Sequence, residues 1–123
     1  MVEYVIDAGP TMNKPDTTFS STKLQLCVEI VTAHIYSRTL ASTTFEAGVF
    51  AFGTGKTRNV LAAEDISETQ YRNVEEVVGI GKPNLDSLKK LQGIRSGTGG
   101  TDGDILDAMI VGQYILQHHN KGF

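Results

Sequence analysis

Hydrophobic and polar positions in the first part of the chain follow first the pattern of a strand and then that of a helix. Residues 2–6 are largely apolar and end at Asp7, which predicts a short buried strand with a carboxylate at its end. From residue 22 to about residue 39, apolar residues recur every three or four positions. This spacing predicts a helix, which Ser20 or Ser21 can cap at its start.

Two further strands are predicted in the middle of the chain. Residues 45–52 are nearly all apolar or small, as expected for a strand that is covered on both faces. The Gly-rich residues that follow predict a turn, and residues 61–70 a polar connection with room for one helical turn. Residues 71–80 predict a third strand, whose charged positions suit the edge of a sheet.

Two helices are predicted toward the end of the chain. Pro83 can start a short helix that runs through Leu91. Residues 104–119 form the clearest helical pattern, with Thr101 as a candidate cap and Asp104 placed to favour the positive end of the helix. Gly112 inside this helix should weaken it by roughly 1 kcal/mol relative to alanine.

The order of these elements is strand, helix, strand, strand, helix, helix. It predicts a single domain over residues 1–123 of the α/β class, with a three-layer, Rossmann-like arrangement. The last predicted helix has a broad apolar face, and in such a fold a further buried strand would follow it. We therefore expect an incomplete domain, about the first half, with roughly three strands and three helices.

Composition narrows the function classes. The net charge of −3 and the scattered basic residues argue against a DNA-backbone clamp, which concentrates Lys and Arg on one face. Cys27 is the single cysteine, so an internal disulfide is excluded and a reducing compartment is expected. No apolar stretch approaches the ~20 residues that span a bilayer, and the acidic start of the chain is unlike a signal peptide, so we expect a soluble intracellular protein.

The sequence from Gly53 to Thr57 reads Gly-Thr-Gly-Lys-Thr and raises the question of a phosphate-binding loop. A Walker A loop has the form G-x-x-x-x-G-K-[ST] and leads directly into a helix. Its first glycine would fall at position 50, which is Phe50 within the predicted strand, and no clear helix start follows Thr57. We therefore interpret Gly53–Thr57 as a turn rather than a cofactor-binding site.

Asp7, Gly9 and Thr11 form the most informative polar stretch. Von Willebrand factor A domains start a Mg²⁺ site with the pattern Asp-x-Ser-x-Ser at the end of their first strand, because a hard cation takes oxygen ligands. Here Gly9 stands at the position of the middle hydroxyl. The expected interpretation is a degenerate site without a bound metal, in which Asp7 accepts hydrogen bonds from N–H groups of the loop.

Other polar stretches have simpler explanations than a catalytic or binding site. Residues 97–104 could cradle an anion at a helix start, but Asp102 and Asp104 would repel it. His118 and His119 are adjacent and would face different directions on a helix, so they do not form a chelating pair. Cys27 falls on the apolar stripe of its helix and is predicted to be a core residue.

Three stretches taken together resemble the large subunit of the Ku heterodimer. They are VIDAGPTM, starting at Val5, GVFAFGTGKTRNVL, starting at Gly48, and TDGDILDAMIVGQYIL, starting at Thr101. They occur in the order of the family's N-terminal domain, which is a von Willebrand A-type α/β domain, and cover nearly the whole chain. In that family the segment matching residues 50–60 is a strand and its turn, not a phosphate-binding loop. Fungal members are often labelled ATP-dependent DNA helicase subunits, but nothing in this segment supplies the loop that such an activity needs.

The resemblance implies a non-enzymatic role in double-strand break repair by non-homologous end joining and in telomere maintenance, in the nucleus. Family members pair with the small Ku subunit and thread DNA ends through a ring that is built after this domain. The N-terminal domain serves mainly as a docking surface for end-joining or telomere proteins. Direct DNA contact by these residues is not expected, and neither the barrel nor the C-terminal region of the family is recognisable in the sequence.

Two other function classes stay open at this point. One is a generic von Willebrand A-like domain that binds a protein through Mg²⁺ at Asp7 and Thr11. The other is a nucleotide-binding enzyme that uses Gly53–Thr57. Thermal stability during a Mg²⁺ titration would identify the first, and ATP binding that depends on Lys56 would identify the second.

Overall fold

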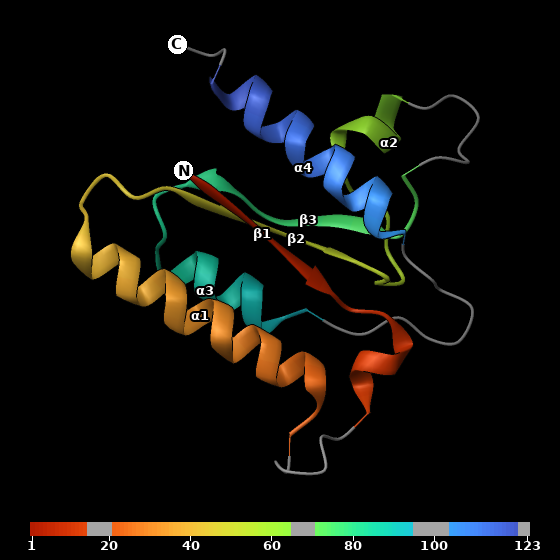
Figure 1. Cartoon of the computed structure of the whole chain (residues 1–123), viewed down its shortest axis with the longest axis horizontal. Helices are drawn as coiled ribbons and strands as arrows, with labels where there is room; N and C mark the ends of the chain where they lie inside the picture. The colour runs from red at the N-terminus through yellow and green to blue at the C-terminus, as the bar shows by residue number, and fades with distance from the viewer. Residues whose placement is uncertain (15–20, 65–70, 95–103, 121–123) are drawn as a thin grey trace.

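The computed structural model describes residues 1–14, 21–64, 71–94 and 104–120. Eight elements lie within these residues (Figure 1). The strands are β1 (Val2–Asp7), β2 (Ala47–Phe52) and β3 (Val74–Gly81). The helices are η1 (Pro10–Asn13, a 3-10 helix), α1 (Lys23–Ala41), α2 (Val60–Glu64), α3 (Leu85–Gln92) and α4 (Ile105–Asn120).

The three strands form one mixed sheet in the order β1-β2-β3. β1 runs parallel to β2, whereas β3 runs antiparallel to it. All six residues of β2 are buried, which confirms the prediction of a strand covered on both faces. β3 lies at one edge of this sheet, as its charged positions predict, and β1 lies at the other edge.

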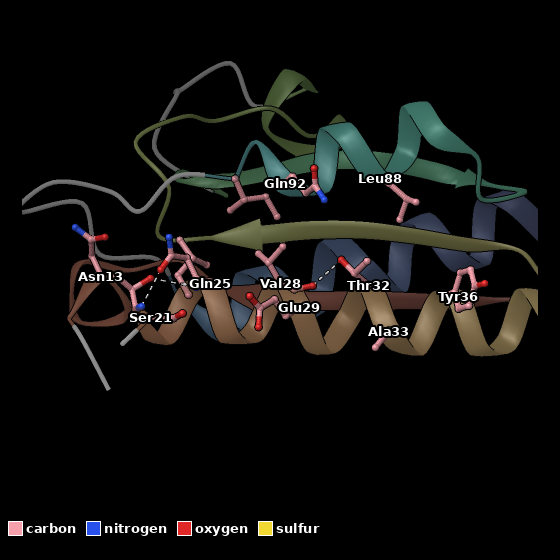
Figure 2. Close-up of a pocket in the computed structure, with 13 residues that line it drawn as sticks. Asn13, Ser21, Gln25, Val28, Glu29, Thr32, Ala33, Tyr36, Leu88 and Gln92 are labelled. Carbon is pink, nitrogen blue, oxygen red and sulfur yellow. Dashed lines mark hydrogen bonds between the residues drawn. The ribbon is translucent and has the colours of Figure 1, made fainter. Parts of the chain in front are cut away.

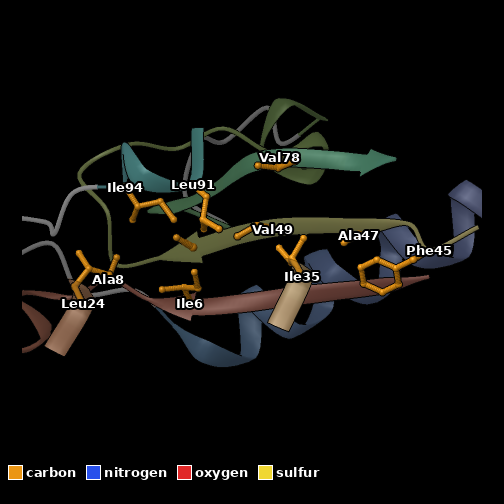
Figure 3. Close-up of a cluster of buried hydrophobic side chains, with 11 residues drawn as sticks. Ile6, Ala8, Leu24, Ile35, Phe45, Ala47, Val49, Val78, Leu91 and Ile94 are labelled. Atoms are coloured by element: carbon orange, nitrogen blue, oxygen red, sulfur yellow. The ribbon is translucent and has the colours of Figure 1, made fainter. Parts of the chain in front are cut away.

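Helices cover both faces of the sheet, and this confirms the predicted three-layer α/β class. α1 and α3 pack on one face, and α4 lies across the other (Figure 1). Between the first pair and the sheet lies a cluster of buried apolar side chains that includes Ile6, Ile35, Val49 and Leu91 (Figure 3). Cys27 is half-buried against this cluster, in agreement with its predicted place in the core.

The second, smaller cluster lies under α4 and is built around Phe50, which has no exposed surface. Val111 and Ala108 of α4 pack against it. Gly112 lies directly over the ring: a Cβ at this position would be 2.5 Å from Phe50 Cζ. The glycine that lowers helix propensity therefore allows α4 to approach the sheet closely, a tertiary role that the sequence pattern did not reveal.

The predicted start of α1 needs a correction. Thr22, not a serine, is the N-cap: its side chain accepts from the Gln25 N–H at 3.2 Å. The Gln25 side chain accepts from the Thr22 N–H in return, at 2.9 Å, which completes a capping box. Ser21 precedes the cap, and Ser20 lies outside the described residues. The reciprocal pair decides the start, because only Thr22 has glutamine three positions later.

The start of α3 also differs from the prediction. Asn84 is the N-cap, and its side-chain oxygen accepts from the Ser87 N–H at 2.9 Å, so Pro83 lies before the helix rather than in its first turn. The predicted apolar face is only partly used. Leu91 is buried, but Leu85 at the start of the helix is 69% exposed.

The third strand begins at Val74 rather than at residue 71. Tyr71 and Asn73 both have φ of +57°, a left-handed conformation that ends a turn and cannot continue a strand. At the start of α4, Asp104 Oδ1 accepts from the Leu106 N–H at 2.8 Å. The favourable placement of Asp104 is thus confirmed, whereas Thr101 and Asp102 lie outside the described residues.

Candidate functional site

Two loops meet at the edge of the sheet where β1 and β2 end. Because the two strands are parallel, their carboxyl ends share this edge, and a site is expected here in α/β folds. Gly9 follows β1 and Gly53 follows β2. Gly53 has φ of +78°, and a Cβ at this position would lie 2.8 Å from the Gly9 backbone. Only glycine at position 53 allows the two loops to approach so closely.

Asp7 lies at this edge with an exposed side chain. Its Oδ1 accepts a hydrogen bond from the Gly9 N–H at 2.9 Å, the role expected for a carboxylate that organises its own loop. Thr11 lies in η1 and is exposed. Within the described residues, no three His, Cys, Asp or Glu side chains are grouped so that they could hold a metal ion. The degenerate metal site at Asp7, Gly9 and Thr11 stays a prediction.

The Gly53–Thr57 segment forms a turn, as predicted. Thr54 is buried, and its hydroxyl donates to the Lys56 carbonyl at 3.0 Å. Thr57 accepts from the Asn73 N–H at 2.8 Å, which ties the turn to the start of β3. The hydroxyl groups that a phosphate loop would direct at a ligand therefore hold the turn together.

The helix after this turn is α2, and it does not follow Thr57 directly. Arg58 first forms an isolated bridge with Glu75. Asn59 is buried and then caps α2: its Oδ1 accepts from the Ala62 N–H at 2.8 Å. Its Nδ2 donates to the carbonyls of Tyr71 and Val74, at 3.0 and 2.8 Å. This arrangement differs from a Walker A loop, in which the lysine and threonine open the helix themselves.

The two histidines near the end of α4 point in different directions, as predicted. His118 Nδ1 lies 2.9 Å from the Tyr114 carbonyl oxygen, and its ring stacks on Tyr114 at 3.7 Å between centroids. His119 Nε2 lies 3.9 Å from a carboxylate oxygen of Glu46. The histidines therefore do not chelate one ion together, and the loop of residues 97–103 lies outside the described residues.

A groove of about 770 Å³ lies between α1 and α3, on the face of the sheet opposite α4 (Figure 2). Leu24, Val28 and Leu88 contribute apolar surface, whereas Thr32 and Gln92 contribute polar groups. Its size falls in the range of ligand-binding pockets. Sequence reasoning did not identify this groove, because it depends on how two helices that are distant in the sequence pack side by side.

Glu3 is a second feature that sequence reasoning missed. Both of its carboxylate oxygens are buried, and neither has a hydrogen-bond partner among the described residues. Burial, reinforced by the nearby negative charge of Glu76, raises the pKa of Glu3 to about 8. An acidic residue within an apolar strand was the available signal, but its burial depends on packing against Gly48 of β2, which is distant in the sequence.

Exposed apolar side chains gather on the first half of α4. Ile105, Leu106, Met109 and Ile110 are all between 47% and 65% exposed. Solvated helices normally present polar residues on this side, so such a group is typical of a protein-binding surface. Within the described residues, no helix combines the length and the apolar character needed to cross a membrane.

Comparison with known proteins agrees with this architecture. The chain is 34% identical over 77 residues to X-ray repair cross-complementing protein 5 of Xenopus laevis. The matched part covers 63% of the chain and 10% of that relative, so it spans about a tenth of the relative's length. A family model described as the Ku70/Ku80 N-terminal alpha/beta domain matches residues 1–123. The chain therefore belongs to the Ku70/Ku80 N-terminal α/β domain family.

Proposed function

We propose that this chain is the N-terminal interaction domain of a Ku large-subunit-like protein that binds DNA ends. The wider role is double-strand break repair by non-homologous end joining, together with telomere maintenance in the nucleus. The family match and the similarity to a protein named for X-ray repair support this assignment. The partners of the whole protein would be the small Ku subunit, DNA ends and the repair or telomere proteins that dock on this domain.

The exposed apolar surface of α4 is the observation that carries the docking role. Four large apolar side chains on two turns of one helix give a surface that a protein partner can bury, and burial contributes about 25 cal/mol per Å². The net charge of −3 gives no electrostatic attraction to phosphates. We therefore assign protein docking to this domain and DNA contact to the rest of the assembly.

Charge substitution on α4 tests the proposal in the protein that contains this domain. Met109→Glu should leave pairing with the small Ku subunit and the shift of linear duplex DNA in a gel unchanged. It should reduce the retention of end-joining proteins on those DNA ends at least several-fold. Ile30→Glu is the matched control, because Ile30 is an equally exposed apolar residue, at 68%, on the opposite helix layer.

Two outcomes would contradict the proposal. Loss of DNA-end binding by Met109→Glu alone would place the DNA contact in this domain. Equal retention of partner proteins by the wild type, Met109→Glu and Ile30→Glu would show that α4 is not the docking surface. Circular duplex DNA, which offers no ends, serves as the background in both measurements.

A further inference from the structure

The groove between α1 and α3 is a surface that the proposed function leaves unused (Figure 2). α3, which forms one wall, packs on β3. The opposite flank of α1 faces β1, where the rings of His34 and Tyr4 meet edge to face at 5.5 Å between centroids. The groove therefore lies on the β3 side of α1, bounded by a helix on each side and away from the β1 edge of the sheet.

The walls of the groove offer no backbone hydrogen bonds to an occupant. Both are α-helices, whose backbone N–H and C=O groups bond within the helix. Two polar side chains of the α1 wall are also engaged: Thr32 donates to the Val28 carbonyl at 2.7 Å, and Gln25 belongs to the capping box with Thr22. An extended peptide would leave the backbone groups that face these walls unpaired, whereas a helix satisfies its own.

The dimensions and the apolar surface of the groove suit a short helix. The α1 wall runs from Leu24 to Tyr36, which spans about 18 Å at 1.5 Å per residue and matches roughly three turns of a second helix. Apolar surface continues past the lining residues at one end, because Leu40 lies one turn after Tyr36 and Leu85 one turn before Leu88. Leu40, Tyr36 and Leu85 are between 63% and 72% exposed. A helix with an apolar stripe would bury these side chains.

The charge of the groove narrows its occupant further. Glu29, which is exposed on the α1 wall, is the one charged residue among the described residues that line the groove. Because no Lys or Arg lines it, the groove gives no attraction to a phosphate or another anion. One carboxylate supplies too few ligands for a metal ion. A Lys or Arg beside the apolar stripe of a bound helix would pair with Glu29.

We propose that the groove between α1 and α3 binds a short amphipathic helix of a partner protein. The apolar stripe of that helix would recur every three or four residues and fill the groove, and a Lys or Arg at its border would lie against Glu29. The groove is on the face of the sheet opposite α4. Binding here is therefore separate from docking on α4, and the two can be tested independently.

Fluorescence anisotropy with a labelled helical peptide tests the groove in the protein that contains this domain. The probe is the capped peptide Gln-Leu-Ala-Gln-Leu-Leu-Gln-Lys-Leu-Ala-Gln-Leu, with a hydrocarbon staple in place of the two Gln residues nearest its C-terminus. The matched peptide has Gln in place of Lys. At low ionic strength the wild type should bind the Lys peptide about threefold more tightly, the scale of an exposed ion pair. Glu29→Gln should bind the two peptides equally.

Ala33→Arg is a second, independent variant that blocks the groove. Ala33 is an exposed residue of the α1 wall, and arginine keeps a high helix propensity, so the fold and the far-ultraviolet circular dichroism should be unchanged. Binding of both peptides should weaken at least about tenfold, because the long charged side chain would occupy the space of the apolar stripe. Ala63→Arg, at an exposed position of α2, is the matched control and should bind both peptides like the wild type.

The proposal fails if the wild type binds neither peptide, if the Lys preference persists in Glu29→Gln, or if Ala33→Arg binds like the wild type. It also fails if an unstapled peptide with Pro in place of both central Leu residues binds equally well, because that peptide cannot form a helix. Loss of binding in Met109→Glu but not in Ala33→Arg would place the peptide on α4 and overturn the assignment. No end-joining protein or DNA enters these measurements, so their failure would leave the proposed function standing.

Discussion

The buried carboxylate of Glu3 predicts that this domain loses stability as the pH rises. The folded state holds the Glu3 proton with a pKa of about 8, against 4.5 for the ordinary side chain. Between these values the folded state binds more protons than the unfolded state, so the free energy of unfolding falls with increasing pH. Below about pH 4.5 both states are protonated, and Glu3 then has no pH-dependent effect.

Replacement by glutamine removes the charge and keeps the shape of the side chain. Above pH 8, the full difference in pKa would correspond to a loss of about 5 kcal/mol in the free energy of unfolding of the wild type. Part of the side chain remains in contact with water, and solvent screening reduces this value, so we expect about 1–2 kcal/mol. For a domain of this length that gain corresponds to a rise in melting temperature of roughly 4–10 °C.

Thermal unfolding followed by circular dichroism, in matched buffers from acid to alkaline pH, measures the effect. Near pH 4.5 the Glu3→Gln variant and the wild type should have the same melting temperature. As the pH rises toward 9, the melting temperature of Glu3→Gln should exceed that of the wild type by an increasing amount. Glu76→Gln should give a smaller gain, because it removes only the neighbouring charge. Glu29→Gln, at an exposed position of α1, is the control and should follow the wild type. A Glu3→Gln difference that is independent of pH would refute this reasoning.

Four other predictions follow from single contacts. Gly112→Ala should destabilise the domain by about 1–3 kcal/mol in urea unfolding despite better helix propensity, because the new methyl group would meet the Phe50 ring; a gain in stability would show that α4 can shift. Asn59→Ala should cost about 2–4 kcal/mol in the same assay, since it removes the cap of α2 and the two hydrogen bonds that Nδ2 donates; a loss below 1 kcal/mol would contradict this account. Lys56→Ala should leave ATP binding, measured by calorimetry, at the wild-type level, and any decrease would support the alternative that Gly53–Thr57 binds a nucleotide. Mg²⁺ should not raise the melting temperature, whereas a rise that Asp7→Asn abolishes would establish a metal site.

Local sequence signals predicted most of the elements but placed several of their ends incorrectly. The helix from Lys23 to Ala41 was predicted from its apolar spacing, yet its cap was assigned one or two residues too early. The capping box was visible in the sequence as Thr22 and Gln25 and was overlooked. The predicted third strand begins at residue 71, three residues before β3, because the left-handed turn at Tyr71 and Asn73 contains no glycine that would indicate it in the sequence.

The candidate site was predicted in part. Asp7 at the end of the first strand and the turn at Gly53 were identified from local patterns, and the structure places both at one edge of the sheet. The close approach of the loop after β1, at Gly9, to the turn after β2, at Gly53, was not predictable from the sequence, because it requires β1 and β2 to be parallel neighbours. The groove between α1 and α3 depends likewise on packing between helices that are distant in sequence.

The sequence by itself determined the three-layer α/β class, the burial on both faces of the strand predicted over residues 45–52, and the family resemblance. These properties are carried by local apolar patterns and short motifs, which act within a few residues. The tertiary structure alone decided that Glu3 is buried without a hydrogen-bond partner among the described residues, and that Gly112 gives room to Phe50. Each of these depends on which distant segments come into contact, and burial and electrostatic environment are set by those contacts rather than by neighbours along the chain.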